Sequence, residues 1–146
     1  MPGFVGTYEH SLDAKGRVIL PAKFRAAFAQ GAYLSRHREG CLALWTPAEF
    51  DRQQAVMRER AAEGNAAERN QERLWAAGSY EVEIDSQGRM VIPARLREFA
   101  HLEEDVLITG ANNRVELWDP ALWAQRVEPE EQWFLEDGPS ERTAAS

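Results

Sequence analysis

The chain has 146 residues, of which 44% are hydrophobic and 10% aromatic, a composition that excludes a disordered protein. No apolar run approaches the ~20 residues that cross a bilayer, no signal peptide is visible, and the single cysteine, Cys41, excludes an intrachain disulfide, so we expect a cytosolic protein. The net charge of −7 does not exclude a nucleic-acid partner, because residues 128–146 hold six acids and one base whereas residues 8–25 hold four bases and two acids.

A segment that begins near the N-terminus occurs twice. The two copies are residues 8–25, YEHSLDAKGRVILPAKFR, and residues 80–97, YEVEIDSQGRMVIPARLR, which are identical at eight of 18 positions. A second match follows, LWTPA at 44–48 and LWDPA at 117–121. The sequence therefore predicts one structural unit present in two copies.

Each copy predicts the same series of elements. A strand leads into an Asp-x-x-Gly turn, a short strand ends at a proline that cannot donate to a sheet ladder, and one or two helical turns follow. A pair of strands comes next, and a capping residue followed by proline starts a helix at Thr46 and at Asp119. The predicted elements are strands 7–12 and 18–20, helix 22–29 and strands 32–37 and 41–45, then strands 79–84 and 90–92, helix 94–101 and strands 105–109 and 114–118.

The region between the copies predicts a helical hairpin. Phe50, Met57 and Ala61 fall at helical spacing within residues 47–77, and Gly64-Asn65 separates a second helix capped by Asn65. The near-neutral charge favours a solvated helix pair with one packing stripe, and a subunit interface is the alternative. We expect a first unit at residues 1–50, a helical hairpin at 51–78, a second unit at 79–123, and a C-terminal helix with an acidic disordered tail at 124–146.

The Asp-x-x-Gly-Arg turn carries the candidate chemistry. Gly16 can adopt a positive φ without steric cost, and Asp13 can accept backbone N–H bonds that fix the turn. Such a turn presents Lys15 and Arg17 away from the core, and a guanidinium can donate two parallel bonds to guanine O6 and N7. The alternative is that Arg17 only pairs with Asp13 and staples the turn.

These residues resemble the MraZ family, whose members carry two AbrB-like (SpoVT-AbrB) units, each with a D-x-x-x-R motif. The motif residues are Asp13 and Arg17, then Asp85 and Arg89, and the resemblance covers about residues 4–135. It implies a sequence-specific DNA-binding transcriptional regulator of the nucleoid that recognises short repeated promoter boxes, upstream of the cell division and cell wall gene cluster. It also implies an α+β fold, with swapped-hairpin β units that form a pseudo-dimeric β-barrel with flanking helices, and a homo-oligomeric ring.

Arg17 and Arg89 are the DNA contacts that the resemblance implies, and neighbouring basic side chains would contact phosphates, which position without specifying sequence. Gln87 replaces Lys15 in the second copy, where residues 80–97 hold three bases and three acids, so the share of the second turn in binding stays open. The complete predicted set is Lys15, Arg17, Lys23, Arg25, Arg89 and Arg95 for DNA, with Asp13, Gly16, Asp85 and Gly88 forming the turns.

No catalytic constellation can be assembled. The histidines, His10, His37 and His101, are scattered, with no cysteine or carboxylate at ligand spacing, so we expect no enzyme, metal, cofactor, small-molecule substrate or membrane partner. Trp45 and Trp118 occupy equivalent positions and are expected in the core. The alternative function is an antitoxin-like or scaffolding oligomer with an AbrB-like fold, which the short acidic tail disfavours because it offers little apolar surface for a toxin.

Overall fold

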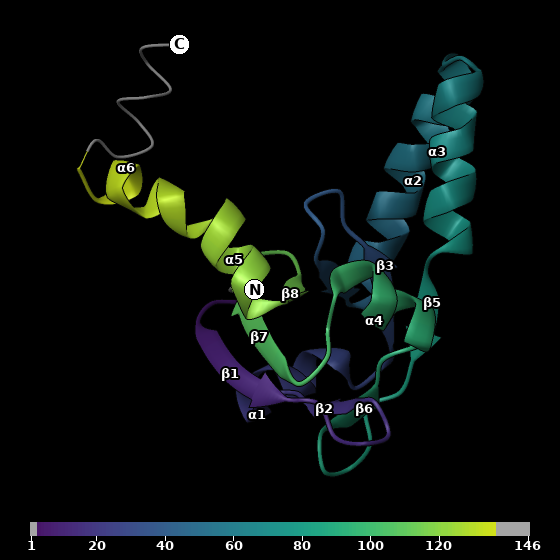
Figure 1. Cartoon of the computed structure of the whole chain (residues 1–146). Helices are drawn as coiled ribbons and strands as arrows, with labels where there is room; N and C mark the ends of the chain where they lie inside the picture. Colours follow the sequence, from purple (N-terminus) through teal and green to yellow (C-terminus); the bar gives the residue numbers. More distant parts are fainter. Residues whose placement is uncertain (1–2, 137–146) are drawn as a thin grey trace.

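Two antiparallel sheets form the centre of an α+β fold, which the computed structural model describes over residues 3–136 (Figure 1). The elements are β1 (Thr7–Ser11), β2 (Arg17–Ile19), α1 (Ala22–Arg25), the 3₁₀ turn η1 (Ala26–Phe28), β3 (Ala32–Arg36), β4 (Leu42–Trp45), α2 (Pro47–Glu63), α3 (Ala66–Ala77), β5 (Tyr80–Val82), β6 (Arg89–Val91), α4 (Ala94–Ala100), β7 (Asp105–Gly110), β8 (Val115–Trp118), α5 (Pro120–Arg126), η2 (Glu128–Glu130) and α6 (Glu131–Glu136). The acidic tail predicted to be disordered lies, from residue 137 onward, outside the described residues.

The strands of the two copies pair with each other. The large sheet has the order β1-β7-β8-β4-β3-β5, so the first strand of each copy pairs with the third strand of the other. The second strands, β2 and β6, form a separate two-stranded sheet, called here the β2–β6 ribbon. Over residues 3–136, β1 and β5 remain the edges of the large sheet, and the pairings do not close a barrel. Neither copy completes a sheet alone, so the two form one folding unit.

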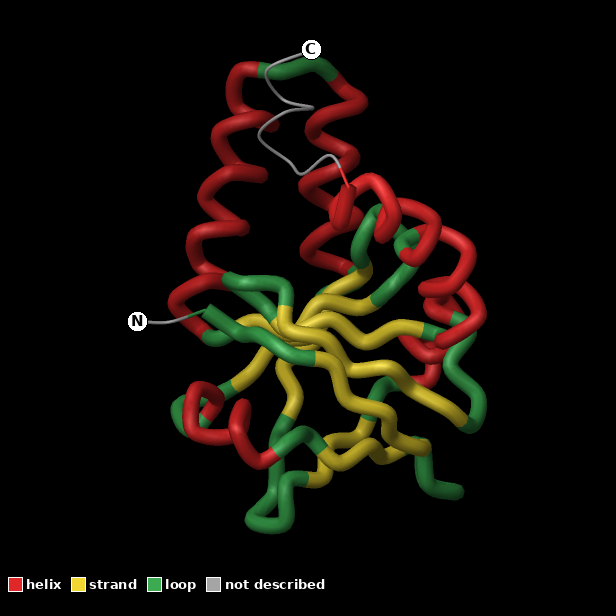
Figure 2. Tube along the Cα trace, turned by 90° about the vertical axis from the view of Figure 1, so that its left-hand side faces the viewer, coloured by secondary structure: helices red, strands yellow, loops and turns green. Residues whose placement is uncertain are grey.

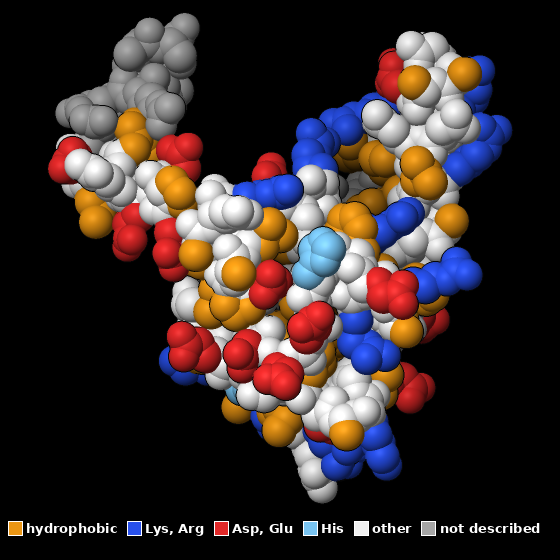
Figure 3. Space-filling view, in the orientation of Figure 1, with side chains coloured by type: hydrophobic (Ala, Val, Ile, Leu, Met, Phe, Trp, Pro, Cys, Tyr) orange, Lys and Arg blue, Asp and Glu red, His pale blue; other side chains and the backbone are white. Residues whose placement is uncertain are grey.

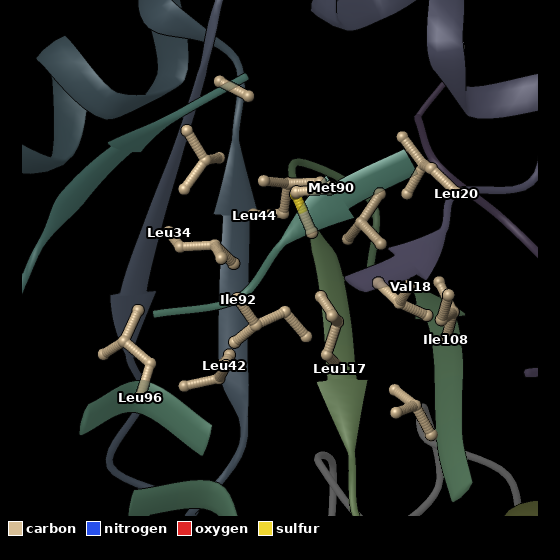
Figure 4. Packing of buried hydrophobic residues seen from close by; sticks show 14 of the residues in the cluster. Val18, Leu20, Leu34, Leu42, Leu44, Met90, Ile92, Leu96, Ile108 and Leu117 are labelled. Atoms are coloured by element: carbon tan, nitrogen blue, oxygen red, sulfur yellow. The ribbon is translucent and has the colours of Figure 1, made fainter. Parts of the chain in front are cut away.

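One hydrophobic core lies between the ribbon and the large sheet. Val18 and Met90, the central residues of the ribbon, are 1% and 0% exposed, and they belong to the same cluster as buried leucines of β3, β4 and β8 (Figure 4). Full burial of each such side chain contributes about 1.5–3 kcal/mol. Trp45 and Trp118 are also buried, as the sequence predicts, in two smaller clusters, and Cys41 is buried in the same cluster as Trp118. This packing fixes which face of the ribbon points outward.

The helical hairpin α2–α3 projects from one side of the sheets (Figures 1 and 2). Its two predicted caps are confirmed, because Thr46 Oγ1 accepts from the Glu49 N–H at 3.3 Å and Asn65 Oδ1 from the Glu68 N–H at 3.2 Å. The predicted side-chain cap at Asp119 is wrong: Pro120 starts α5 as expected, but the carboxylate makes no capping hydrogen bond. None of the helices in residues 3–136 combines the length and apolarity needed to span a membrane.

Candidate nucleic-acid interface

An aspartate organises the turn before each ribbon strand. Asp13 Oδ1 accepts from the backbone N–H groups of Lys15 and Arg17, both at 2.9 Å. The Asp13 carbonyl accepts from the Gly16 N–H at 3.0 Å, and Gly16 has a φ of +75°. The geometry is thus that of a tight turn in which glycine takes the left-handed conformation.

The second copy repeats this turn. Asp85 Oδ1 accepts from the backbone N–H groups of Gln87 and Arg89, both at 2.9 Å, and Gly88 has a φ of +81°. The Asp85 carbonyl accepts from the Gly88 N–H at 2.9 Å. Two turns of one design therefore precede β2 and β6.

The motif arginines contact their own aspartates through one edge only. Arg17 Nε donates to Asp13 Oδ2 at 2.7 Å, and Arg89 Nε donates to Asp85 Oδ2 at the same distance. The Arg17 and Arg89 side chains are 28% and 35% exposed, and within residues 3–136 their Nη atoms make no hydrogen bond. The two interpretations of the motif are therefore compatible, because the guanidinium pairs with the turn through Nε and leaves both Nη groups without a hydrogen bond within residues 3–136.

The turn carboxylates are ionised at neutral pH. The backbone N–H of Arg17, followed by its guanidinium, holds the pKa of Asp13 below its ordinary value, and the backbone N–H of Arg89 is the main cause of the lowered pKa of Asp85. Because the folded pKa is lowered, each carboxylate stabilises its turn above the pKa of the unfolded chain, and this contribution is lost as the pH falls through the folded pKa. Both carboxylates are therefore charged at neutral pH and stabilise their turns there.

An arginine of the opposite copy supports each turn. Gly16 O accepts from the Ile92 N–H at 3.0 Å, and Gly88 O accepts from the Leu20 N–H at 2.8 Å. The guanidinium of Arg97 lies against Gly16, and that of Arg25 lies against Gly88. These two side chains are half-buried, and each donates through Nε to a strand-end carbonyl at 2.9 Å. Arg25, expected to contact phosphate, thus has a visible structural role, and Arg97 was missing from the predicted site.

The two turns lie at the same end of the molecule. The ribbon register pairs Arg17 with Val91 and Ile19 with Arg89 around the buried central pair, so both motif arginines are on the outer face. Figures 1 and 2 show both turns at the end away from the tip of the α2–α3 hairpin. Lys and Arg side chains gather at that end in Figure 3. Lys15 is exposed on the first turn, and Lys23 and Arg95 are exposed at equivalent positions of α1 and α4.

Alanine at Gly16 is expected to destabilise the fold by about 1–2 kcal/mol, because an L residue is strained in the left-handed conformation. The added Cβ would also lie 2.7 Å from Arg97 Cζ. Thermal or urea unfolding measures this loss. In a double-mutant cycle, G16A combined with Arg97→Ala should lose less than the sum of the single losses, because the clash is removed. Strict additivity would show that Arg97 does not pack on the turn, and Ala14→Ser is the exposed control.

The structure also brings together three potential ligands that the sequence left apart. The donor atoms of His37, Cys41 and Glu116 lie within 4.8 Å of one another, a proximity that the spacing of these residues in the sequence did not indicate. Arg114 donates to Glu116 Oε2 through Nε at 2.9 Å and Trp118 Nε1 to Oε1 at 3.0 Å, and burial raises the pKa of the Cys41 thiol. A carboxylate already neutralised by Arg114 beside a protonated thiol suits a buried polar network better than a cation.

Comparison with known proteins gives one consistent family. The family model described as "MraZ protein", with the added note "antitoxin-like", matches residues 4–74 and again residues 75–142. A protein of Kocuria rhizophila named "Transcriptional regulator MraZ" is 42% identical over 133 residues, which cover 91% of this chain and 92% of that protein. Proteins of the same name from Micrococcus luteus and Acetivibrio thermocellus are 40% identical over 133 residues (91% and 92% covered) and 42% identical over 120 residues (82% and 83% covered). These names designate regulators rather than enzymes.

Proposed function

The chain belongs to the MraZ family, and from this membership and the paired turns we propose that it is a sequence-specific DNA-binding transcriptional regulator. The observation that carries the proposal is the outer face of the ribbon. There, Arg17 and Arg89 each present Nη groups that make no hydrogen bond within residues 3–136, from a turn whose backbone is fixed on both sides. A rigid, forked donor is what discriminates guanine in the major groove, at about 1–3 kcal/mol per bidentate contact.

We assign the remaining basic side chains by their exposure. Lys15, Lys23 and Arg95 are exposed around the turns and contact phosphates, which fixes the protein on the duplex without specifying sequence. Arg25 supports the second turn from behind and reaches DNA only at its margin. Specificity thus comes from Arg17 and Arg89, and orientation from the exposed basic side chains around them.

The crossed pairing of the copies supports the finer fold assignment. In the proposed architecture, units at residues 1–50 and 79–123 exchange hairpins as AbrB-like units do and enclose a pseudo-dimeric barrel, with the hairpin at 51–78 and the C-terminal helix at 124–146 as additions. The pairings β1–β7 and β5–β3 are equivalent in the two copies of the repeat. The ribbon pairs the same strand of each copy, β2 with β6, so the pseudo-twofold axis that relates the copies passes through it. Such a pseudo-twofold unit presents its two arginines symmetrically to a duplex.

The ribbon is small, so we propose that each copy of the protein recognises a short box and that the promoter repeats this box. The family resemblance implies that these promoter boxes lie on the nucleoid, upstream of the cell division and cell wall gene cluster. Two specifying arginines can define only a few base pairs. Several copies of the protein must then act together, which requires a homo-oligomer.

Two surfaces support assembly between copies. A groove of about 990 Å³ between the α2–α3 hairpin and the sheet contains the cations Arg36, Arg38 and Arg60. Trp75 also lines it, with Nε1 buried and lacking a hydrogen-bond partner within the described part of the chain. The α5–α6 arm (residues 120–136) projects on the other side of the molecule (Figures 1 and 3).

The arm complements the groove in charge and polarity. Phe134 and Leu135 are 59% and 72% exposed, and the arm carries the acids Glu128, Glu130, Glu131 and Glu136. We propose that the arm of one copy enters the groove of the next. Because this contact joins two different surfaces, it repeats head to tail and closes into a ring when the rotation allows.

Serine at both Phe134 and Leu135 is expected to shift the oligomer to smaller species, because the apolar part of the arm is removed while its helix and charge remain. Light scattering at micromolar protein gives the mass of each species. The matched control is Ala124→Ser, an exposed change on the same arm. A wild-type monomer, or an unchanged mass in the double variant, would contradict assembly through the arm.

Selection from a random duplex library tests the function itself. The wild-type protein should enrich a short, guanine-containing box, because the arginines specify guanine. Recovery of unenriched sequences at every round would contradict sequence-specific binding.

A further inference from the structure

The outer face of the β2–β6 ribbon carries two exposed apolar side chains. Ile19 is 46% exposed and Val91 is 52% exposed, although their strand neighbours Val18 and Met90 are almost completely buried. Single exposed apolar residues are normal on a protein surface. Here, however, two β-branched residues occupy the same position of both copies, on one face, which makes them a feature of the ribbon.

The register places each of these side chains directly opposite a motif arginine. Ile19 is opposite Arg89, and Val91 is opposite Arg17. Side chains directly opposite each other in an antiparallel pair have Cβ atoms about 4.5–5.5 Å apart. The four residues therefore form a small quadrilateral with the arginines on one diagonal and the apolar residues on the other. A ligand that contacts both arginines must also cover Ile19 and Val91.

This arrangement suits the edges of bases better than the sugar–phosphate backbone. In the major groove, guanine presents the acceptors O6 and N7, and thymine presents the C5-methyl group, whereas the minor groove presents no methyl. The major groove also admits a two-stranded ribbon. We propose that Ile19 and Val91 contact thymine methyl groups beside the guanines bound by the arginines. This inference rests on the proposed DNA-binding function and adds a second base to its specificity.

A second copy of the chain fits this face poorly. A twofold contact through the ribbon would place the guanidinium groups of the two copies close together in an apolar setting. Like charges at such positions destabilise a pair. DNA instead supplies both the acceptors and the methyl groups.

Replacing thymine by uracil in the enriched box provides a direct test, because it removes one methyl and leaves every hydrogen-bonding group in place. Each contacted methyl should contribute about fourfold in affinity, since burying one such group is worth ~0.8 kcal/mol. Dissociation constants are measured for the thymine and uracil duplexes with wild type, Ile19→Ser and Val91→Ser. Each serine variant should lose the thymine preference on its own side of the box. Val5→Ser, a change at a residue 68% exposed outside the ribbon, should keep the wild-type preference.

The outcomes separate this inference from the function on which it rests. If wild type enriches no sequence, the proposed function fails and this inference with it. If wild type binds an enriched box but prefers thymine to uracil at no position, only the thymine contact is overturned, and this result does not depend on whether the serine variants fold. If the serine variants keep the thymine preference but change the oligomeric mass in light scattering, the face is a contact between copies and the thymine contact is again overturned.

Discussion

A duplex with several boxes in tandem is expected to bind roughly 10²- to 10⁴-fold more tightly than a duplex with one box, because linked contacts raise avidity without any new type of contact. In the proposed function, a single ribbon contributes two base-contacting arginines, Arg17 and Arg89, and a few phosphate contacts from exposed basic side chains. Non-specific binding through phosphate contacts has dissociation constants of only about 10⁻⁴–10⁻⁶ M. An oligomer that holds several ribbons in fixed register converts these weak contacts into a tight complex.

The register of the boxes should follow the DNA helix. Ribbons presented on one side of an assembly reach boxes about one turn apart, roughly 10–10.5 base pairs. Inserting five base pairs between boxes rotates the second box by about half a turn and should remove most of the avidity. A full-turn insertion is the matched control and should weaken binding less. Equal losses from the two insertions, or equal affinity for one box and for several, would contradict a register fixed by the protein.

The variant Arg17→Ala is expected to lose specific DNA binding while the protein stays folded. Each bidentate contact with guanine contributes about 1–3 kcal/mol, which is roughly a 5- to 150-fold change in affinity per site and is multiplied over the copies of an oligomer. The fold should survive, because Arg17 pairs with Asp13 at an exposed position, where an ion pair contributes little stability. The variant Arg89→Ala should lose less, since the second turn has Gln87 in place of Lys15.

Two further variants separate the loss of base recognition from the loss of charge. Lysine at position 17 keeps the charge but not the fork, so Arg17→Lys should retain non-specific binding while it loses discrimination between bases. Arg58→Ala removes an exposed arginine from α2 and should leave binding unchanged. Unchanged affinity of folded Arg17→Ala for the enriched box would falsify the assigned role.

The local parts of this site could be predicted because their causes are local. Asp13, Gly16 and their counterparts indicate a turn within five residues, and the hydrogen bonds of that turn lie within the same residues. Because the sequence repeats, the second turn could be predicted from the first copy alone, before the fold was determined. Likewise, Thr46 and Asn65 cap helices that start next to them in sequence.

The remaining features depend on residues far apart in the chain. Arg25 was interpreted as a phosphate contact because it is basic and near the turn, but the pairing of β2 with β6 brings it against Gly88 of the other copy. The approach of Glu116 to Cys41 similarly requires β8 to lie beside β4. Hydrophobic pattern shows that a strand is buried, but it does not show which strand lies beside it.

Competitive titration of the wild-type protein, with the enriched box against a shuffled duplex of the same composition at physiological salt, tests the central claim most directly. Both duplexes carry the same phosphate charge, so their ratio of dissociation constants isolates base recognition from electrostatic attraction. The paired arginine turns predict at least about a 10³-fold preference for the box. Equal affinity for the two duplexes would contradict the claim that this ribbon reads sequence.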